Sequence, residues 1–485
     1  MTLAERLTEF AARLEFEDIP ADVVANVRLR ALDILGIALA SSTSDLAPSV
    51  LGAVNGWGRG ACSVIGSSLT APPPLAALAN GAFAHGLDFD DTHAISITHA
   101  SSVILPTVLA LGEAGGSSGR AVVTAAVAGY EAMTRVGMAA PGQFHARGFH
   151  ATAVCGTFGA TLAAGRLEGL DCGRLTAALG IAGSFASGIN EHLEDGSWVK
   201  RVHPGWAAHS GIVAAGLARG GFSGPATIFE GRFGLYRTFL RAEPDRSPFD
   251  TLGKEWETLR VGFKPYPCCH YNHAYLDCAL ALRREHRIEP DAIEGIECLV
   301  PAGEVPIVCE PRESKLRPRT PYDAQFSLTY SVAAALVDGR VGLDTYAKDR
   351  ISDERTLALA ARVQHTVDPA SRFPDGSQGG FGFDSATAGS SRRVSPTVAA
   401  APRGRSSPAR SSPSSATTLG ARCPRTGWPL SKRSRCRSTR STPWGRSWAR
   451  AASDRACRNL ALSRSVIAGL AIGVASAGEG VRSNV

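Results

Sequence analysis

Long segments of alanine, glycine and aliphatic residues most constrain the fold of this 485-residue chain. Residues 121–140 read AVVTAAVAGYEAMTRVGMAA, and residues 151–170 read ATAVCGTFGATLAAGRLEGL. Each glycine inside a helix costs about 1 kcal/mol relative to alanine. Such helices are therefore stable where their small side chains allow close packing against neighbours. The pattern predicts a closely packed all-helical domain over residues 1–262.

The N-terminus predicts an immediate helix and a cytoplasmic protein. Thr2 and Glu5 have the spacing of a capping box. The segment MTLAERLTEF carries two glutamates and lacks the apolar core of a secretory signal. A membrane span requires about 18 uninterrupted apolar residues, and we find no such window. We therefore expect no membrane among the partners of this chain.

The pattern changes after residue 262. Residues 293–303 alternate between apolar and polar side chains, as a strand does. Residues 326–340 have the pattern of a helix that ends at a glycine, and residues 355–369 that of a helix followed by a second strand. These signals predict a smaller α+β lid domain over residues 263–373, so that the fold class is mostly α.

Residues 374–485 differ in charge and composition from the rest. They carry 18 Lys and Arg residues against 4 acidic residues, a balance of +14, whereas the first 373 residues carry 33 against 40, a balance of −7. We find no helical or strand period in this low-complexity tail, and expect no packed core there. An Arg-rich segment of this kind is typical of RNA-binding tails. A shifted reading frame in a GC-rich gene gives the same composition, and this is the interpretation we prefer.

The segment HGLDFDDTHAISITH, residues 85–99, concentrates acids and imidazoles among small apolar neighbours. On a helix, His85, Asp88 and Thr92 would share one face, and His99 would follow in a loop just before the next helix. A solvated acidic helix end with a structural histidine is the alternative. A DDxxD-type metal site is a weaker one, because we find no second metal motif.

Two other segments place cationic or imidazole groups before small-residue helices. His150 precedes one such helix, and Lys200, Arg201 and His203 precede another. Each is equally well explained as a surface cluster, but together they suggest a pocket for a polyanion such as a polycarboxylate. The motif PCCHYNH, residues 267–273, lacks the second ligand pair that a zinc site needs. We expect no metal and no cofactor.

These motifs together resemble the MmgE/PrpD family. The resemblance rests on HGLDFDDTH with SSVILP, GFHATAVCGTFGA, VKRVHPGWAAHSG, GFSGPATIFEGRFG, KPYPCCHYNH and FSLTYSVAAALVDG, and it covers about residues 3–373 in order. It implies a large helical domain with an α+β lid, a homodimer and cofactor-independent chemistry. The tail departs from the family, whose members continue with a lid strand and closing helices.

The resemblance also implies a set of site residues. The implied catalytic residues are His99, His150, Asp88 and Tyr330, and the implied substrate-binding residues are Thr92, Lys200, Lys264 and His273. In this scheme the lysines hold substrate carboxylates and the two catalytic histidines transfer protons near neutral pH. Asp88 orients an imidazole, Thr92 donates a hydrogen bond, and Tyr330 donates a proton after lid closure. His270 is the alternative to His273 as the lid histidine.

The family chemistry acts at the carbon alpha to a carboxylate of a small di- or tricarboxylate. We expect a lyase, by default a hydro-lyase like 2-methylcitrate dehydratase. The alternatives within the family are a decarboxylase like cis-aconitate decarboxylase and an epimerase like iminodisuccinate epimerase. The alternatives of another class are an RNA-associated protein that works through its Arg-rich tail, which we do not favour, and an inactive homologue that retains the fold.

Overall fold

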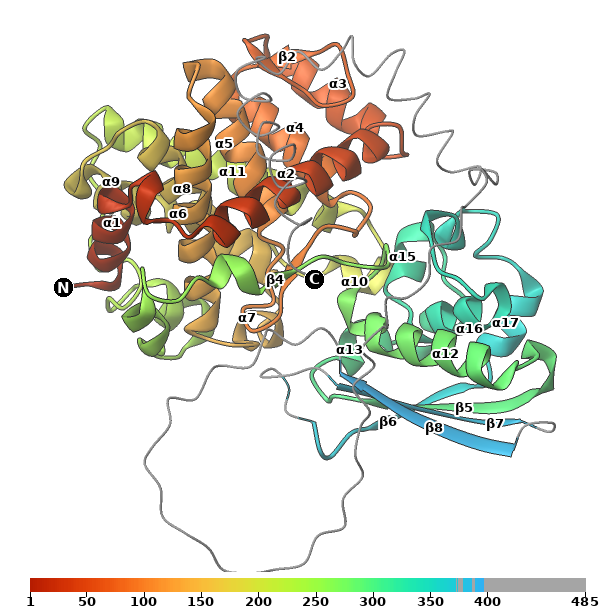
Figure 1. The fold of residues 1–485 in the computed structure, drawn as a ribbon. Coiled ribbons are helices and arrows are strands. Elements are labelled where there is room, and N and C mark those ends of the chain that lie inside the picture. The colour runs from red at the N-terminus through yellow and green to blue at the C-terminus, as the bar shows by residue number, and fades with distance from the viewer. Residues whose placement is uncertain (372, 374–377, 386–388, 397–485) are drawn as a thin grey trace, which may run out of the picture. The chain divides into compact units, whose positions relative to one another are not determined.

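The computed structural model describes residues 1–371, 373, 378–385 and 389–396. Its described part is mostly helical, as the sequence predicts. Residues 3–219 form the helices α1 to α11, joined by short segments and small strand pairs (Figure 1). The helices are α1 Leu3–Arg13, α2 Ala21–Ser41, α3 Ala47–Trp57, α4 Pro73–His85, α5 Ser101–Gly115, α6 Gly119–Met138, α7 Gln143–Ala146, α8 Ala151–Leu167, α9 Cys172–Ala182, α10 His192–Asp195 and α11 Val199–Arg219.

Local signals fix where the first helix begins. The Thr2 hydroxyl accepts from the Glu5 backbone N–H at 3.1 Å, and the Thr2 N–H donates to the Glu5 carboxylate at 2.7 Å. This reciprocal pair is the capping box that the sequence predicts. Leu3 and Leu7, which follow it, are buried in the core.

Glycines allow α4, α8 and α11 to pack in close contact. A Cβ on Gly205 of α11 would lie 2.1 Å from the Leu78 carbonyl oxygen of α4, and one on Gly211 would lie 2.5 Å from the Ala160 Cβ of α8. Both distances are far below van der Waals contact. The three helices matter for function, because α4 ends at His85, α8 begins just after His150, and α11 begins one residue before Lys200.

The C-terminal part combines short helices with one sheet. Its helices are α12 His273–His286, α13 Val305–Val308, α14 Arg312–Leu316, α15 Pro321–Gln325, α16 Leu328–Asp338 and α17 Glu354–Ala360. The sheet has the order β6 (Val363–Val367), β5 (Ile293–Val300), β7 (Gln378–Ser385), β8 (Gly389–Pro396). β5 pairs in parallel with β6 and antiparallel with β7, and β8 is antiparallel to β7. Helices α12 and α16 lie on one side of this sheet (Figure 1).

The sheet extends beyond residue 373, where the sequence led us to expect the end of ordered structure. β7 pairs with β5 in the register Cys298↔Phe381, and β8 continues the sheet through Gly382↔Arg392. The expectation was wrong for these two strands because the backbone of β7 pairs with β5 and that of β8 pairs with β7, which requires no alternation of apolar side chains. Residues 397–485, which hold most of the expected tail, lie outside the described residues.

Two small strand pairs lie outside this sheet. β1 (Cys62–Ser63) pairs with β2 (Thr70–Ala71), and β3 (Thr92–His93) pairs with β4 (Val261–Gly262). The β3–β4 pair joins the motif after α4 to the chain just before Lys264. Within the described ranges, every helix falls short of the length and apolarity that a bilayer crossing requires.

Candidate active site

The acidic motif after α4 is a folded loop and does not continue the helix, contrary to our expectation. α4 ends at His85, with Gly86 as its C-cap. Asp88 has a left-handed backbone with φ +50°, which is incompatible with a continuing helix. Thr92 then starts β3, whose pairing with β4 is a long-range interaction that helical spacing cannot reveal.

Asp88 lies between two ammonium groups. Lys200 Nζ lies 2.6 Å from Asp88 Oδ1, and Lys264 Nζ lies 3.0 Å from Oδ2 and 2.8 Å from the Asp88 carbonyl oxygen. All three residues are buried. Burial alone would raise the pKa of Asp88, but the two lysines outweigh it and hold that pKa well below its usual range. Asp88 is therefore a carboxylate that gathers two cations, and not the imidazole partner that we expected.

His85 is held by the next acid in the motif. Its Nδ1 lies 2.8 Å from the Asp90 carboxylate, and Lys200 Nζ lies 3.0 Å from its Nε2. Because a carboxylate accepts and an ammonium donates, Nδ1 carries the proton and Nε2 accepts. Burial and the nearby Lys200 lower the pKa of His85, consistent with a neutral ring. Asp90, His85 and Lys200 thus form one hydrogen-bonded chain.

His99 is fixed in one tautomer by backbone contact. Its Nδ1 lies 2.8 Å from the Asp91 carbonyl oxygen and 3.1 Å from the Thr92 hydroxyl. A carbonyl oxygen only accepts, so Nδ1 carries the proton and Nε2 keeps its lone pair. Burial lowers the pKa of His99, and the two lysines lower it further. The backbone N–H of His99 donates to the Thr152 hydroxyl of α8, which fixes the base of the side chain.

Asp91 and Arg30 connect this loop to the helices and the strand around it. The Arg30 guanidinium of α2 lies 2.7 Å from Asp91 Oδ2 and also donates to the Val261 carbonyl of β4. The backbone N–H of Ser101, the first residue of α5, donates to Asp91 Oδ1 at 3.1 Å. Asp91 therefore ties together α2, β4 and α5 while its own carbonyl orients His99.

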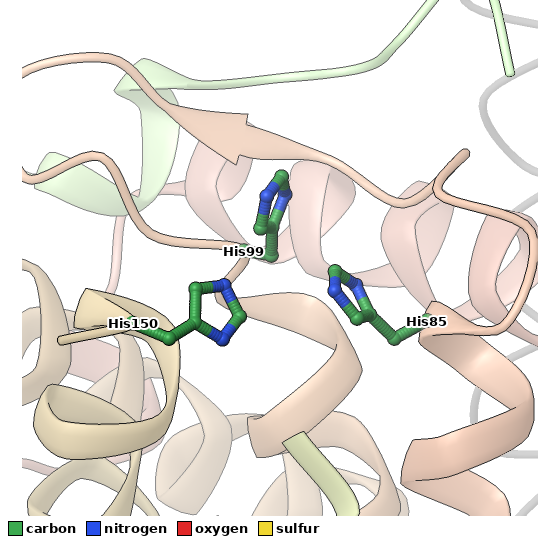
Figure 2. A group of neighbouring side chains, drawn as sticks. All are labelled: His85, His99 and His150. Atoms are coloured by element: carbon green, nitrogen blue, oxygen red, sulfur yellow. The ribbon is translucent and has the colours of Figure 1, made fainter. Parts of the chain in front are cut away.

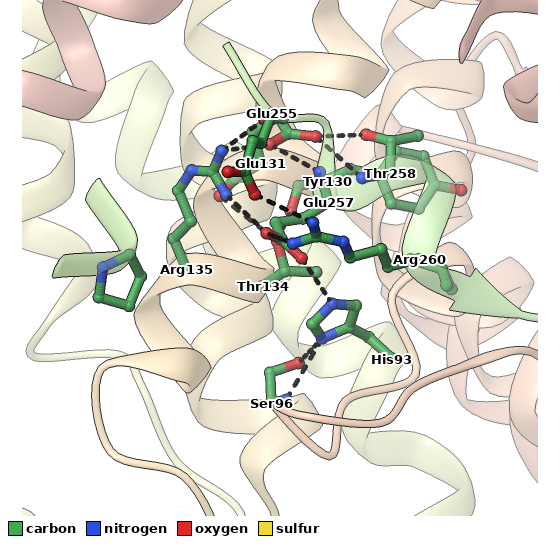
Figure 3. Close-up of polar contacts among 12 residues, drawn as sticks. His93, Ser96, Tyr130, Glu131, Thr134, Arg135, Glu255, Glu257, Thr258 and Arg260 are labelled. Atoms are coloured by element: carbon green, nitrogen blue, oxygen red, sulfur yellow. Dashed lines mark hydrogen bonds and ion pairs between the residues drawn. The ribbon is translucent and has the colours of Figure 1, made fainter. Parts of the chain in front are cut away.

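A second buried network fixes the other side of the β3–β4 pair (Figure 3). Glu131 of α6 accepts from the Thr258 N–H and hydroxyl at 2.9 and 2.7 Å, and it lies 3.2 Å from Arg135. His93 of β3 bonds Glu257 through Nε2 at 3.1 Å. Thr258 and Glu257 lie in the short helix η4 (Glu257–Arg260), directly before β4. The network therefore connects α6 to η4 and to β3, the strand that carries Thr92.

Three imidazoles converge in the site. The rings of His85, His99 and His150 point toward one another (Figure 2), with one nitrogen of each within 4.8 Å of the others. Among the described residues this group could hold a metal ion. In the structure, however, Lys200 already donates to His85 Nε2, so an ion would have to displace an ammonium group. The contacts therefore fit a site of neutral imidazoles beside two lysines better than a metal centre.

His99 and His150 line a cavity of about 30 Å³, together with Asp88 and Lys200. Its wall combines residues from the helical part with residues from the C-terminal part. The lining residues are Asp88, Ile97, His99, His145, His150, Asn190, His192, Leu193, Lys200, Cys269, His270, Tyr271, Ile307 and Phe326. Phe326 lies under Lys200, whose Nζ is 5.0 Å from the ring centroid.

Two predicted residues lie away from this cavity. His273 starts α12 and contacts the Cys268 carbonyl oxygen through Nε2 at 3.2 Å, whereas His270 lines the cavity. Of these two histidines, His270 is therefore the one that faces the cavity, because the His273 ring contacts the backbone of its own segment. Tyr330 in α16 donates to the Thr345 carbonyl at 2.8 Å and does not line the cavity.

The structure brings the other predicted residues together. Asp88, His99, His150 and Lys200 line the cavity, and Lys264 and Thr92 contact them directly. The sequence did not identify Asp90 or Arg30 as site residues. It also did not reveal the contact between His150 and His203. Asp90 could have been found, since it lies within the quoted motif five residues after His85. Arg30 carries no local signal, because its partner Asp91 is 61 residues away.

Comparisons with known proteins agree with this geometry. The MmgE/PrpD N-terminal domain matches residues 5–247, and the MmgE/PrpD C-terminal domain matches residues 266–404. The cis-aconitate decarboxylase-like protein oryM of Aspergillus oryzae is 30% identical over 375 residues, 73% of this chain and 77% of that protein. A cis-aconitate decarboxylase of Aspergillus terreus is 29% identical over 379 residues, 74% of this chain and 76% of that protein.

The similarity extends to animal proteins. The cis-aconitate decarboxylase of Mus musculus is 28% identical over 332 residues, 65% of this chain and 64% of that protein. Both family domains are matched in order, and together they cover most of the chain. The chain therefore belongs to the MmgE/PrpD family and is an enzyme of the lyase type.

Proposed function

We propose that this enzyme decarboxylates a small unsaturated tricarboxylate of the cis-aconitate type. The observation that carries the proposal is the convergence of Lys200 and Lys264 on Asp88 beside neutral imidazoles. The names of the relatives favour decarboxylation over the dehydration that we expected from the sequence.

The lysines are suited to hold substrate carboxylates. An ammonium group has three N–H donors. Lys200 uses one on Asp88 and one on His85, and Lys264 uses two on Asp88. Each keeps one for a substrate oxygen. The single charge of Asp88 leaves the pair with a net positive charge, which favours a polyanion in a buried site.

The reaction itself needs one proton. When a carboxylate on the carbon next to a carbon–carbon double bond leaves as CO₂, the electron pair of the broken carbon–carbon bond forms a new double bond. The electrons of the old double bond then take a proton at the carbon alpha to a second carboxylate. A lysine beside that carboxylate stabilises the developing enolate charge.

The two predicted catalytic histidines have different roles in the proposed reaction. His99 presents a bare Nε2, because its Nδ1 proton is bound to the Asp91 carbonyl. It is therefore suited to accept hydrogen bonds or a proton. His150 has no carbonyl partner that fixes its tautomer, and it is suited to donate the proton from Nε2.

The proposal is tested with the purified full chain and a panel of substrates. Cis-aconitate, 2-methylcitrate and iminodisuccinate are each incubated with the enzyme, and the products are identified by mass spectrometry. We expect loss of CO₂ from cis-aconitate and no turnover of the other two. Loss of water from 2-methylcitrate without any release of CO₂ from cis-aconitate would instead support the dehydratase.

A further inference from the structure

His150 has a buried imidazole partner that is not among the predicted site residues. The Nδ1 atoms of His150 and His203 lie 3.1 Å apart, and both residues are buried. His203 lies in α11, three residues after Lys200, so both project from the first turns of one helix. Gly188, whose φ is +114°, leaves room beside the His203 ring, which a Cβ there would approach to 3.5 Å.

The contact between two Nδ1 atoms restricts where the protons lie. A hydrogen bond needs one donor and one acceptor, so one of the two Nδ1 atoms carries a proton and the other does not. If His203 donates, a neutral His150 has its proton on Nε2, which points toward His99 and His85 (Figure 2). If His150 donates, its Nε2 is bare. The pair therefore sets whether His150 is an acid or a base.

We propose that His203 is a proton-relay residue that protonates His150 at Nδ1 while His150 gives its Nε2 proton to the substrate. The proposal rests on the proposed decarboxylation, which consumes one proton per substrate molecule. The relay deepens the proposed function, because it lets a neutral His150 act as the acid without becoming an anion.

His150 Nε2–H gives its proton to the substrate carbon as CO₂ leaves, and His203 Nδ1–H passes its proton to His150 Nδ1. In the same event His203 Nε2 takes a proton from water, and the hydroxide that remains combines with the released CO₂ as bicarbonate. Both rings are then neutral with exchanged tautomers. Before the next substrate binds, the Nδ1 proton returns from His150 to His203, His203 Nε2 releases its proton to solvent, and His150 Nε2 takes up a proton from solvent.

The other titratable groups near His150 and His203 are less suited to the proton relay. His99 Nδ1 is bonded to the Asp91 carbonyl, and both nitrogens of His85 are engaged by Asp90 and Lys200. The groups that face His203 are Lys200 on its own helix, His150 before α8 and His192 in α10, whose ring centroid is 6.4 Å away. Burial and then Lys200 lower the pKa of His203 to about 4, so a neutral ring is its resting state near pH 7.

The first test replaces His203 by asparagine. An asparagine amide can still hydrogen-bond His150 Nδ1, but it cannot pass a proton. We expect His203→Asn to lower kcat by about 10²-fold, the lower end of the range for a lost proton-transfer group, with KM unchanged. His209→Asn is the matched control, since His209 lies on the same helix, stacks on Trp206 and does not line the cavity.

The second test uses chemical rescue. His203→Ala opens a space where free imidazole can bind, so added imidazole should raise kcat with saturation, and it should leave His209→Asn unaffected. Equal kcat values for His203→Asn and His209→Asn would overturn the relay. Failure of imidazole to rescue a folded His203→Ala, checked by its far-UV circular dichroism, would overturn it as well. Wild-type enzyme that releases no CO₂ would instead count against the proposed function itself.

Discussion

The ammonium group of Lys200 contacts both a carboxylate and an imidazole of the site. It lies 2.6 Å from Asp88 Oδ1 and 3.0 Å from His85 Nε2, and it packs over the Phe326 ring. These partners approach one nitrogen from different directions. A compact ammonium can satisfy all of them, whereas a planar guanidinium has a different geometry.

The first prediction concerns Lys200. Lys200→Ala should raise KM and lower kcat together, because the same charge binds the substrate carboxylate and stabilises the enolate that forms there. Lys200→Arg should not restore either constant fully. Steady-state kinetics on cis-aconitate measure both. An arginine variant with wild-type constants would show that only the charge of this residue matters.

The second prediction concerns His99. His99→Ala should lower kcat by about 10²–10⁴-fold, the usual range for loss of a proton-transfer group. His209→Ala is the control, because its ring stacks on Trp206 outside the cavity. Near-wild-type kcat in His99→Ala would leave the proton chemistry to His150 and His270, which line the same cavity.

At this scale the sequence predicts the identity of the residues better than their contacts. The motif with Asp88 and His99 is recognisable from the chain alone, and so are Lys200 and Lys264. The partners of Asp88 are not, because they lie 112 and 176 residues away in sequence. His270 and His273 could not be separated either, since one turn of chain decides which of them faces the cavity.

At the scale of elements, the β3–β4 pair could not be predicted from the sequence. Each strand has two residues, Thr92–His93 and Val261–Gly262, which is too short for any periodic pattern. The helices α4, α8 and α11 are predictable because their small residues extend over several turns. The strands β7 and β8 are not, because the backbone pairing of β7 with β5 and of β8 with β7 supplies the order that their sequence pattern does not reveal.

The third prediction tests the buried network behind this strand pair. Glu131→Ala would remove the nearer of the two carboxylates that pair with the fully buried Arg135, and should lower the free energy of unfolding by about 3–5 kcal/mol. Glu255→Ala removes a partly exposed carboxylate that pairs with Arg260, and should cost less than about 1 kcal/mol. Urea unfolding measures both. Equal destabilisation by the two changes would contradict the assigned role of the network.

At the scale of the whole molecule, many imidazoles are buried in one region. His85, His99, His150 and His270 all have a pKa well below the ordinary value, with burial as the largest cause. The pKa of His145 is lowered to about 4 for the same reason. Such groups are neutral in the folded enzyme near pH 7, while the unfolded chain protonates them below about pH 6.5.

The fourth prediction is the resulting acid sensitivity. Between about pH 6.5 and 4 the unfolded state binds protons that the folded state does not, so stability falls as pH falls. Each such histidine contributes up to about 1.4 kcal/mol per pH unit. His145→Asn should therefore show a shallower decline of the free energy of unfolding than wild type between pH 6.5 and 5. Urea unfolding at several pH values compares the slopes, and identical slopes would contradict a neutral buried His145.

The fold class follows from the sequence because it depends on composition and period over hundreds of residues. The lid boundary does not, since residues 378–385 and 389–396 belong to the expected tail and yet form two strands of the sheet that contains β5. The family match to residue 404 extends past the expected boundary as well. A strand can be ordered by the hydrogen bonds of its backbone as well as by the pattern of its side chains. Only the side-chain pattern can be recognised in a single sequence.

The most direct test of the account follows cis-aconitate by NMR in D₂O with the purified enzyme. We predict that each molecule of CO₂ released is matched by one deuterium at a product carbon alpha to a carboxylate. We also predict that both signals appear much more slowly in Lys200→Ala, while His209→Ala keeps the wild-type rate. Release of CO₂ without deuterium at that carbon, or wild-type turnover in Lys200→Ala, would contradict protonation at the site that Asp88, Lys200 and the imidazoles form.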